Sequence, residues 1–219
     1  MAHYQPGPLG EFRGGVGGII VYRWRHLKIG RSSPTKKKRK KKGSESQQTQ
    51  RSRLGVISRY LSKFTLVIRD GFPSKRMKMT SMNAAVKENY HTALVGEFPN
   101  IEVADALIQL SKGSLDHIYR PTLHISEEDI VTVKWTNPQH QKLNVDDEDV
   151  VHLVFYSDEL RRRQMFYDTQ AKRADGFIEM PAYVSFMKGQ VHAWMFLVSV
   201  DGKRASNCRY LGSFSFNKK

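Results

Sequence analysis

The first apolar pattern of the chain is a short β-type segment behind a run of glycines. Residues 19–24, Ile-Ile-Val-Tyr-Arg-Trp, alternate imperfectly between apolar and polar, and residues 27–30 follow within reach of a return strand. Glycine is the usual residue where backbones approach closely or φ is positive, and the segment is preceded by Gly14, Gly15, Gly17 and Gly18. The pattern therefore predicts an N-terminal β-hairpin.

Two helical patterns follow the hairpin. Apolar residues recur at spacings of three and four, which indicates an amphipathic helix, at Leu54, Ile57, Leu61, Phe64 and Ile68. We expect Ser44 or Ser46 to cap the start of this helix and Gly71 to end it. A second helix is predicted to begin at a cap formed by Thr80 or Ser81 and to end before Gly96.

From about residue 106 the chain consists of short β-type segments separated by turn signals. The predicted strands lie in residues 106–112, 130–137, 150–157, 163–169, 177–184, 191–200 and 205–216. Strands at this spacing are typical of an antiparallel sandwich of the immunoglobulin or fibronectin type III kind. We expect its core to contain Trp135, Tyr156, Trp194 and Phe196.

These patterns predict an α+β chain in two parts. Residues 1–105 form a unit with the β-hairpin and two amphipathic helices, in which residues 30–46 are a basic linker loop. Residues 106–219 form the immunoglobulin-like β-sandwich. A hydrophobic content of 39% is too high for a disordered chain and is compatible with packed cores.

Charge changes this picture because it is concentrated in the first part. The formal net charge is +15, and residues 1–96 carry 21 Lys and Arg against 4 Asp and Glu. Such a surplus favours binding to a polyanion or an acidic partner. The candidate polyanion-binding residues are Arg23, Arg25, Lys36, Lys37, Lys38, Arg39, Lys40, Lys41, Lys42, Arg51, Arg53, Arg59 and Lys63.

The densest part of this charge is the run from Lys36 to Lys42. If such a run neutralises several phosphates of a nucleic acid, the release of counterions gives the protein a salt-sensitive affinity. The run also has the composition of a nuclear import signal. The alternative is a solvated loop with no ligand, and an isolated run of lysines fits that alternative equally well.

Aromatic and basic residues are interleaved in the predicted hairpin. On a strand, Arg23 and Arg25 share one face, and Tyr22 and Trp24 lie on the other. Such aromatic residues can stack on nucleic-acid bases. The favoured alternative is that Trp24 packs on the helices while the arginines face water, because strand aromatics are usually core residues.

The glycines at 14–18 superficially resemble a phosphate loop, but the Lys-Ser or Lys-Thr pair of that motif does not follow them. We interpret Gly14, Gly15, Gly17 and Gly18 instead as an assembly contact, where a hairpin backbone meets another subunit. Exposed strand edges of this kind often pair with a partner.

The sequence contains no recognisable catalytic constellation. The histidines form no HExxH motif or close ligand pair, and the acidic cluster at residues 146–149 lacks the spacing of an EF-hand, so we expect a solvated loop there. Cys208 has no activating neighbour and is expected to be structural. No catalytic residue, metal site or cofactor is predicted.

The chain has no secretory signal pattern and no apolar run long enough for a membrane helix. We therefore expect no membrane insertion and a cytoplasmic location, which is also compatible with later release as part of a particle.

Three stretches together resemble a known family. They are residues 7–34 with Trp24, residues 78–100 followed by Ser111-Lys112-Gly113-Ser114, and the closing Asp201-Gly202-Lys203 with Tyr210-Leu211-Gly212. The set is similar to an uncharacterised family of Bacteroidota proteins, the domain of unknown function numbered 6266, over essentially the whole chain. The resemblance implies a bacterial protein with an immunoglobulin-like C-terminal part, which argues against nuclear import, and it supplies no catalytic residue.

The first functional hypothesis is accordingly a non-enzymatic structural protein that contacts a protein partner or copies of itself through the glycine-rich hairpin and the sandwich. The close alternative is a sequence-independent nucleic-acid binding protein that uses the basic first half. An enzyme with an unrecognised site ranks third.

Overall fold

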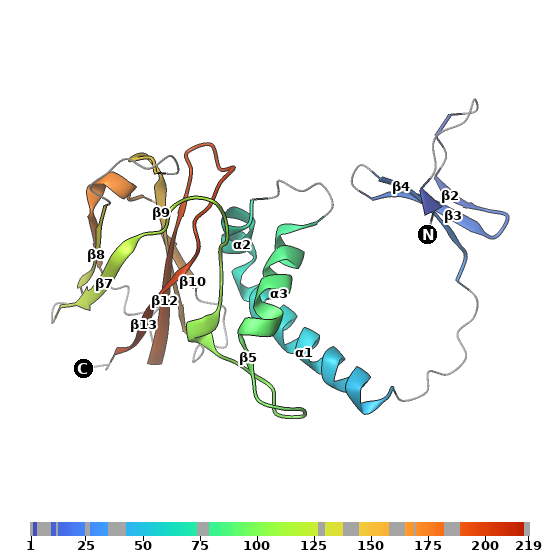
Figure 1. Ribbon diagram of the computed structural model, residues 1–219, viewed down its shortest axis with the longest axis horizontal. Coiled ribbons are helices and arrows are strands. Elements are labelled where there is room, and N and C mark those ends of the chain that lie inside the picture. Colours follow the sequence, from blue (N-terminus) through green and yellow to red (C-terminus); the bar gives the residue numbers. More distant parts are fainter. Residues whose placement is uncertain are drawn as a thin grey trace.

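A computed structural model gives the fold of the chain (Figure 1). The structure describes residues 2–3, 10–11, 13–24, 27–34, 43–73, 79–126, 130–137, 145–157, 165–168, 170–181 and 189–216. The predicted run Lys36–Lys42 and the predicted contact residue Arg25 lie outside these ranges.

The N-terminal part is a small antiparallel sheet. It contains β1 (Ala2–His3), β2 (Gly14–Val16), β3 (Ile19–Trp24) and β4 (Leu27–Ser32), in the order β1-β4-β3-β2. The predicted hairpin of residues 19–30 is therefore confirmed as β3 and β4, and two further strands flank it. Gly17 and Gly18 form the two-residue loop between β2 and β3 with φ of 55° and 79°. Positive φ at both positions is what the favoured two-residue hairpin turn requires.

The helical part begins where the cap signals predict. The helices are α1 (Glu45–Leu61), the 3₁₀ turn η1 (Ser62–Phe64), α2 (Thr65–Gly71) and α3 (Ser81–Thr92). The Ser44 hydroxyl accepts a hydrogen bond from the Gln47 N–H at 3.4 Å, and the Thr80 hydroxyl accepts one from the Asn83 N–H at 3.2 Å. Side-chain oxygens at these positions satisfy N–H groups that have no partner within the helix.

The predicted apolar stripe is only partly continuous. Ile57, Leu61, Phe64 and Ile68 are buried, whereas Leu54 is exposed. The stripe also runs through three elements, α1, η1 and α2, where the spacing predicted a single helix. The tighter 3₁₀ turn at residues 62–64 changes the helix phase between the two α-helices.

Two larger antiparallel sheets make up the C-terminal half. The four-stranded sheet has the order β10-β9-β12-β13, with β10 (Met165–Asp168), β9 (Val150–Ser157), β12 (Gly189–Val198) and β13 (Arg209–Phe216). The three-stranded sheet has the order β11-β8-β7, with β11 (Phe177–Pro181), β8 (Ile130–Thr136) and β7 (Tyr119–Ile125). Short elements complete the fold: β5 (Leu94–Val95), β6 (Glu102–Val103), and the 3₁₀ turns η2 (Asp105–Leu107) and η3 (Arg173–Asp175). The α+β composition with antiparallel sheets is confirmed.

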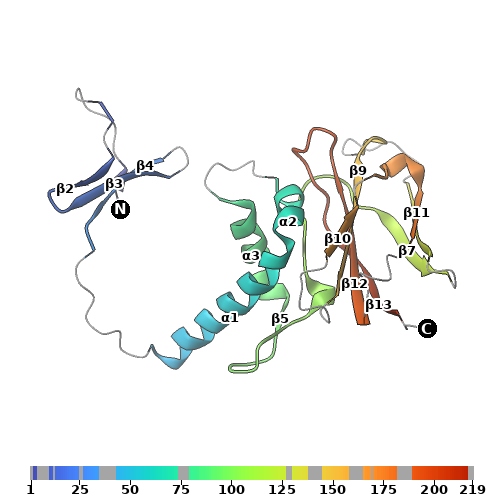
Figure 2. The same cartoon turned by 180° about the vertical axis from the view of Figure 1, so that it is seen from behind.

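Helices, four-stranded sheet and three-stranded sheet form three successive layers, which both views make plain (Figures 1 and 2). One face of the four-stranded sheet packs on the three-stranded sheet, with Val133 of β8 and Leu153 of β9 in the shared core. The other face packs on the helices, with Phe64 and Ile57 beside Val154 of β9. The central sheet is therefore buried on both faces.

This layering corrects the predicted sandwich core. Trp135 lies between the two sheets as expected, but Tyr156, Trp194 and Phe196 point to the opposite face and pack on the helices. The reason is that β9 and β12 are buried on both sides, so that their apolar residues alternate between two different cores. The predicted domain boundary between residues 105 and 106 stays a prediction. The core between the helices and the four-stranded sheet contains residues from both sides of it.

One predicted strand is wrong and another was missed. Residues 106–112 form no strand, because η2 and an extended connection occupy them. The missed strand is β7, which pairs with β8 in the three-stranded sheet. Pro121 and a register shift between Tyr119 and Thr122 interrupt β7, which obscures its alternation in the sequence.

The connection after η2 passes through a tight crossing that explains a glycine. A Cβ on Gly113 would lie 2.1 Å from the carbonyl oxygen of Ala205. The same oxygen accepts a hydrogen bond of 3.0 Å from the Leu115 N–H. The backbone of residues 113–115 therefore runs directly against the segment before β13, and only glycine leaves room at position 113.

Candidate interaction surface

The register of the N-terminal sheet sorts the predicted contact residues onto two faces. Directly paired residues share a face, so Ile20, Tyr22 and Trp24 of β3 lie on the same side as Ile29 and Arg31 of β4. We call this side the aromatic face. Arg23 lies on the opposite side, as the alternation predicted.

The aromatic face combines a cation with exposed rings. The Arg31 guanidinium lies over the Tyr22 ring, 5.5 Å from its centroid, and Trp24 is 40% exposed. Trp24 belongs to neither hydrophobic core, and the sheet lies apart from the helices in both views (Figures 1 and 2). The favoured interpretation, in which Trp24 packs on the helices, is therefore wrong.

The opposite face carries an exposed apolar pair. Val16 and Ile19 face each other across β2 and β3 and are 68% and 53% exposed. Beside them, Val21 is buried, and Lys28 forms an ion pair of 3.7 Å with Glu11. This face is therefore apolar at the end near the Gly17-Gly18 turn and charged at the other end.

The glycines of this sheet are needed for backbone conformation rather than for close packing inside the chain. Gly14, Gly17 and Gly18 have positive φ, and a Cβ on any of them would meet no atom of the described chain within 4 Å. Gly15 has only ordinary contacts with Ile19 and Ile20. β2 is an edge strand of the sheet, and its three residues, Gly14–Val16, are all exposed.

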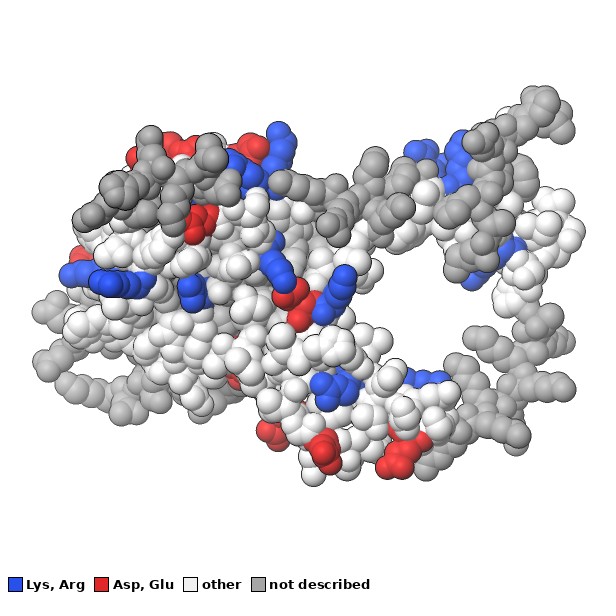
Figure 3. Space-filling model, in the orientation of Figure 1, with Lys and Arg blue, Asp and Glu red and all other residues white. Residues whose placement is uncertain are grey.

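The predicted cations of α1 and η1 do not share one free surface. The Arg53 guanidinium lies 5.6 Å from the centroid of the Tyr90 ring on α3. The Lys63 ammonium donates to the Tyr156 hydroxyl and lies over the Tyr60 ring. Only Arg51 and Arg59 are exposed. On the face drawn in Figure 3, the described Lys and Arg side chains are scattered and have Asp and Glu between them.

A buried ion pair lies where the sequence predicted a solvated acidic loop. Asp149 and Arg173 are both almost fully buried, and the Arg173 Nη2 lies 3.2 Å from Asp149 Oδ2. Burial raises the pKa of the Asp149 carboxyl, an effect that the Asp146 N–H and the Arg173 guanidinium partly offset. The expectation of a solvated loop therefore holds for residues 146–148 and is wrong for Asp149.

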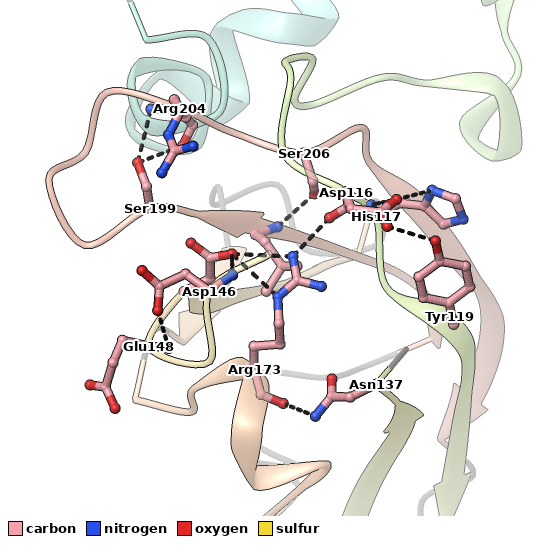
Figure 4. A network of polar contacts seen from close by, with 12 residues as sticks. Asp116, His117, Tyr119, Asn137, Asp146, Glu148, Arg173, Ser199, Arg204 and Ser206 are labelled. Carbon is pink, nitrogen blue, oxygen red and sulfur yellow. Dashed lines mark hydrogen bonds and ion pairs between the residues drawn. The ribbon is translucent and has the colours of Figure 1, made fainter. Parts of the chain in front are cut away.

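The Arg173 residue joins four parts of the fold (Figure 4). Its Nη2 donates to the Asp116 carbonyl at 2.8 Å, and its own carbonyl accepts from the Trp135 indole at 2.9 Å and from the Asn137 amide at 2.8 Å. Sequence reasoning missed this residue because its partners lie far from it in the chain, and no local pattern marks a buried arginine.

A second polar cluster connects η2 to the central sheet. The Asp105 carboxylate accepts a hydrogen bond from the Tyr60 hydroxyl and lies 3.8 Å from the His192 Nε2. The other ring nitrogen of His192 lies 2.8 Å from the Tyr210 hydroxyl. Burial raises the pKa of Tyr210. These contacts hold the edge of the sheet against the helical layer.

Chemistry typical of enzymes is sparse in the described part of the chain. No group of three or more His, Cys, Asp or Glu residues in these ranges is placed to hold a metal ion. Cys208 is buried, and burial raises the pKa of its thiol to about 12. A thiol with this pKa has almost no thiolate at neutral pH and is a poor nucleophile.

Comparison with known proteins gives a family and no curated relative. The model of a family described as "Family of unknown function (DUF6266)" matches residues 11–212. The chain belongs to the DUF6266 family. The match covers the N-terminal sheet from β2 onward, the helices, the three-stranded sheet and the four-stranded sheet as far as residue 212 of β13 in this DUF6266 protein. No curated protein matches the sequence. Within the described ranges, no helix of the DUF6266 chain is both long and apolar enough to cross a membrane.

Proposed function

We propose that this protein is a non-enzymatic interaction protein that joins an assembly through its N-terminal sheet, with the layered C-terminal half as its scaffold. The observation that carries the proposal is the exposed apolar pair Val16 and Ile19 beside the edge strand β2. Large apolar side chains exposed together on a small sheet mark a surface that a partner covers.

The edge of the sheet supports the same proposal. Among the described residues β2 pairs only with β3, and its outer N–H and C=O groups have no strand partner within these residues, which suits the addition of one more strand. A partner strand added there gains backbone hydrogen bonds and at the same time covers Val16 and Ile19. Gly14 and Gly15 have no side chains that would obstruct this approach.

The proposal also includes a more specific fold for the C-terminal half. We propose an immunoglobulin- or fibronectin-III-like relationship for the two packed sheets, since both are antiparallel and Trp135 lies in the core between them. The absence of an enzymatic activity and the cytoplasmic location stay predictions.

Light scattering of the full chain at increasing concentration tests the assembly proposal. We expect the mass to rise with concentration, or a partner to be recovered from the source organism, and we expect the double variant Val16→Lys/Ile19→Lys to abolish either result. The matched control is Val200→Lys, which places the same charge on an apolar residue that is 69% exposed in the turn after β12. A strict monomer without a partner, or equal loss in the control, contradicts the proposal.

Polyanion binding through the first part is the second candidate. It is supported by the Arg31 guanidinium stacked on Tyr22 beside the exposed Trp24, which together offer a cation and rings to a base and its phosphate. Replacement of residues 36–42 by Ser and Gly should lower the slope of log affinity for duplex DNA against log salt by about 0.9 for each phosphate that the run neutralises. An unchanged slope means that the run does not bind the DNA.

A further inference from the structure

A pocket of about 410 Å³ opens where the three-stranded sheet meets the edge of the central sheet. One wall is the start of β7 and the residues before it, and the other wall is the start of β13. The described lining residues are His117, Ile118, Tyr119, Arg120, Pro121, Arg209 and Tyr210. This volume lies near the lower end of the range for small-molecule sites, which is about 300–1,000 Å³.

The backbone at one wall of this pocket is strained. Arg120 has a φ of 45°, and it is the one non-glycine residue with positive φ in the part of the chain that the structure describes. A proline follows Arg120 and restricts its backbone further. The register of β7 against β8 shifts between Tyr119 and Thr122, so the strain coincides with a β-bulge. Bulges and strained residues of this kind often direct a side chain toward a functional site.

The rings of the pocket are fixed by hydrogen bonds from behind. The Tyr119 hydroxyl donates to the Asp116 carboxylate at 2.6 Å, and the His117 ring lies 4.6 Å from the Tyr119 ring (Figure 4). Asp116 is held in turn by the buried Arg173, which donates to its carbonyl. Across the pocket, the Tyr210 hydroxyl is bound to His192. Hydrogen bonds within the chain therefore position the hydroxyl groups of both tyrosines.

The charged side chains among the described lining residues are arginines, and the Asp116 carboxylate lies behind them on Tyr119 and 3.4 Å from His117 Nδ1. Arg120 and Arg209 are both exposed, and neither forms an ion pair with any described residue. The described lining residues include no Asp or Glu. A different groove, beside α3, is lined by Lys87, Lys112, Lys203 and Arg204, but it also contains the Glu88 carboxylate, which pairs with Lys112, and its Lys203 pairs with Asp201. The pocket at β7 therefore differs from this groove in having two arginines and no carboxylate among its described lining residues.

We propose that this pocket binds the phosphate group of a small phosphate monoester, with Arg120 and Arg209 as its ligands. A guanidinium matches the oxygens of phosphate in a bidentate geometry. A phosphate monoester carries a charge of about −1.5 to −2 at neutral pH, which two guanidinium groups balance. The pocket volume leaves space for the organic part of the monoester beside Tyr119 and Pro121.

Calorimetric titration of the full chain with glycerol 3-phosphate, at constant ionic strength, tests this proposal. Inorganic phosphate and acetate are titrated in parallel to separate a monoester site from a site for free phosphate or for any anion. We expect saturable binding of one equivalent of glycerol 3-phosphate, weaker binding of inorganic phosphate and no binding of acetate. Equal affinity for acetate, or the absence of saturable binding by both phosphate compounds, overturns the proposal.

The variants separate the ligand role of Arg120 from a structural one. Arg120→Gly removes the guanidinium and suits the positive φ, so the melting temperature should be unchanged or higher while the affinity falls about tenfold or more. Arg209→Gln should lower the affinity by a similar factor. The control is Arg59→Gln, because Arg59 is an exposed arginine on α1 outside the pocket. Unchanged affinity in both pocket variants, or equal loss in the control, shows that these arginines are not the ligands.

Discussion

Replacement of Gly113 by alanine tests the crossing between the connection after η2 and the segment before β13. The new Cβ would lie 2.1 Å from the Ala205 oxygen, 2.9 Å from its carbonyl carbon and 3.1 Å from its nitrogen. Since Cβ atoms in proteins keep more than 3.0 Å from such neighbours, one of the two backbones must move by about 1 Å. Neither neighbour is a flexible side chain that could move aside.

The size of the effect follows from what this movement disrupts. The hydrogen bond from the Leu115 N–H to the Ala205 oxygen, 3.0 Å long, is lost or weakened, which costs about 1 kcal/mol. The displacement of packed backbone adds about 1–3 kcal/mol. We therefore expect Gly113→Ala to lower the free energy of unfolding by about 2–4 kcal/mol.

Urea unfolding followed by tryptophan fluorescence measures this loss. A Trp24→Phe background restricts the signal to Trp135 and Trp194, which are buried in the two cores. At a slope of about 3 kcal/mol per molar urea, the midpoint should fall by about 1 M. The control is Gly55→Ala at an exposed position of α1, where a Cβ meets no atom within 4 Å and should stabilise by about 0.5–1 kcal/mol. A Gly113→Ala midpoint within error of the parent refutes the close approach.

Two further predictions concern buried titratable groups. His152 is buried, and burial lowers its pKa from 6.5 to about 4. As the pH decreases, the unfolded chain therefore binds a proton at His152 before the folded chain does. The free energy of unfolding should fall by about 3 kcal/mol between pH 6.5 and pH 4. Unfolding curves across this range should lose most of that dependence in His152→Phe, and an equal dependence in the variant contradicts the reasoning. The buried Cys208 should react with a thiol reagent only after unfolding in urea. The control is Asn207→Cys in a Cys208→Ser background, which moves the thiol to the exposed neighbouring position and should react in the folded chain. Rapid labelling of native Cys208 would show that the thiol is accessible.

The elements that the sequence predicted well are those with a local cause. The caps Ser44 and Thr80 and the helix end at Gly71 depend on hydrogen bonds and backbone angles within a few residues. The β3–β4 hairpin is local as well. Features that depend on distant partners were not predictable in the same way.

The strands of the central sheet illustrate this limit. Val150–Ser157 is almost continuously apolar, which identifies a buried strand and leaves open which residues face which layer. Packing against the helices, which lie in the first part of the chain, determines which residues face which layer. The candidate surface was also predicted only in part. The alternation of side chains along a strand gives the faces of Tyr22, Arg23 and Trp24. The contacts of Arg53 with Tyr90 and of Lys63 with Tyr156 depend on the tertiary fold.

The burial of the central sheet on both faces has a consequence for the order of folding. Phe64 contacts Tyr156 and Trp194, at ring separations of 5.1 and 5.8 Å, and both partners come much later in the chain. The early helices therefore cannot complete their core until β9 and β12 have paired, which closes a large loop at considerable entropic cost. During synthesis the helices emerge long before their partners, so this high contact order implies slow folding and a period in which Ile57, Leu61 and Phe64 depend on protection from aggregation.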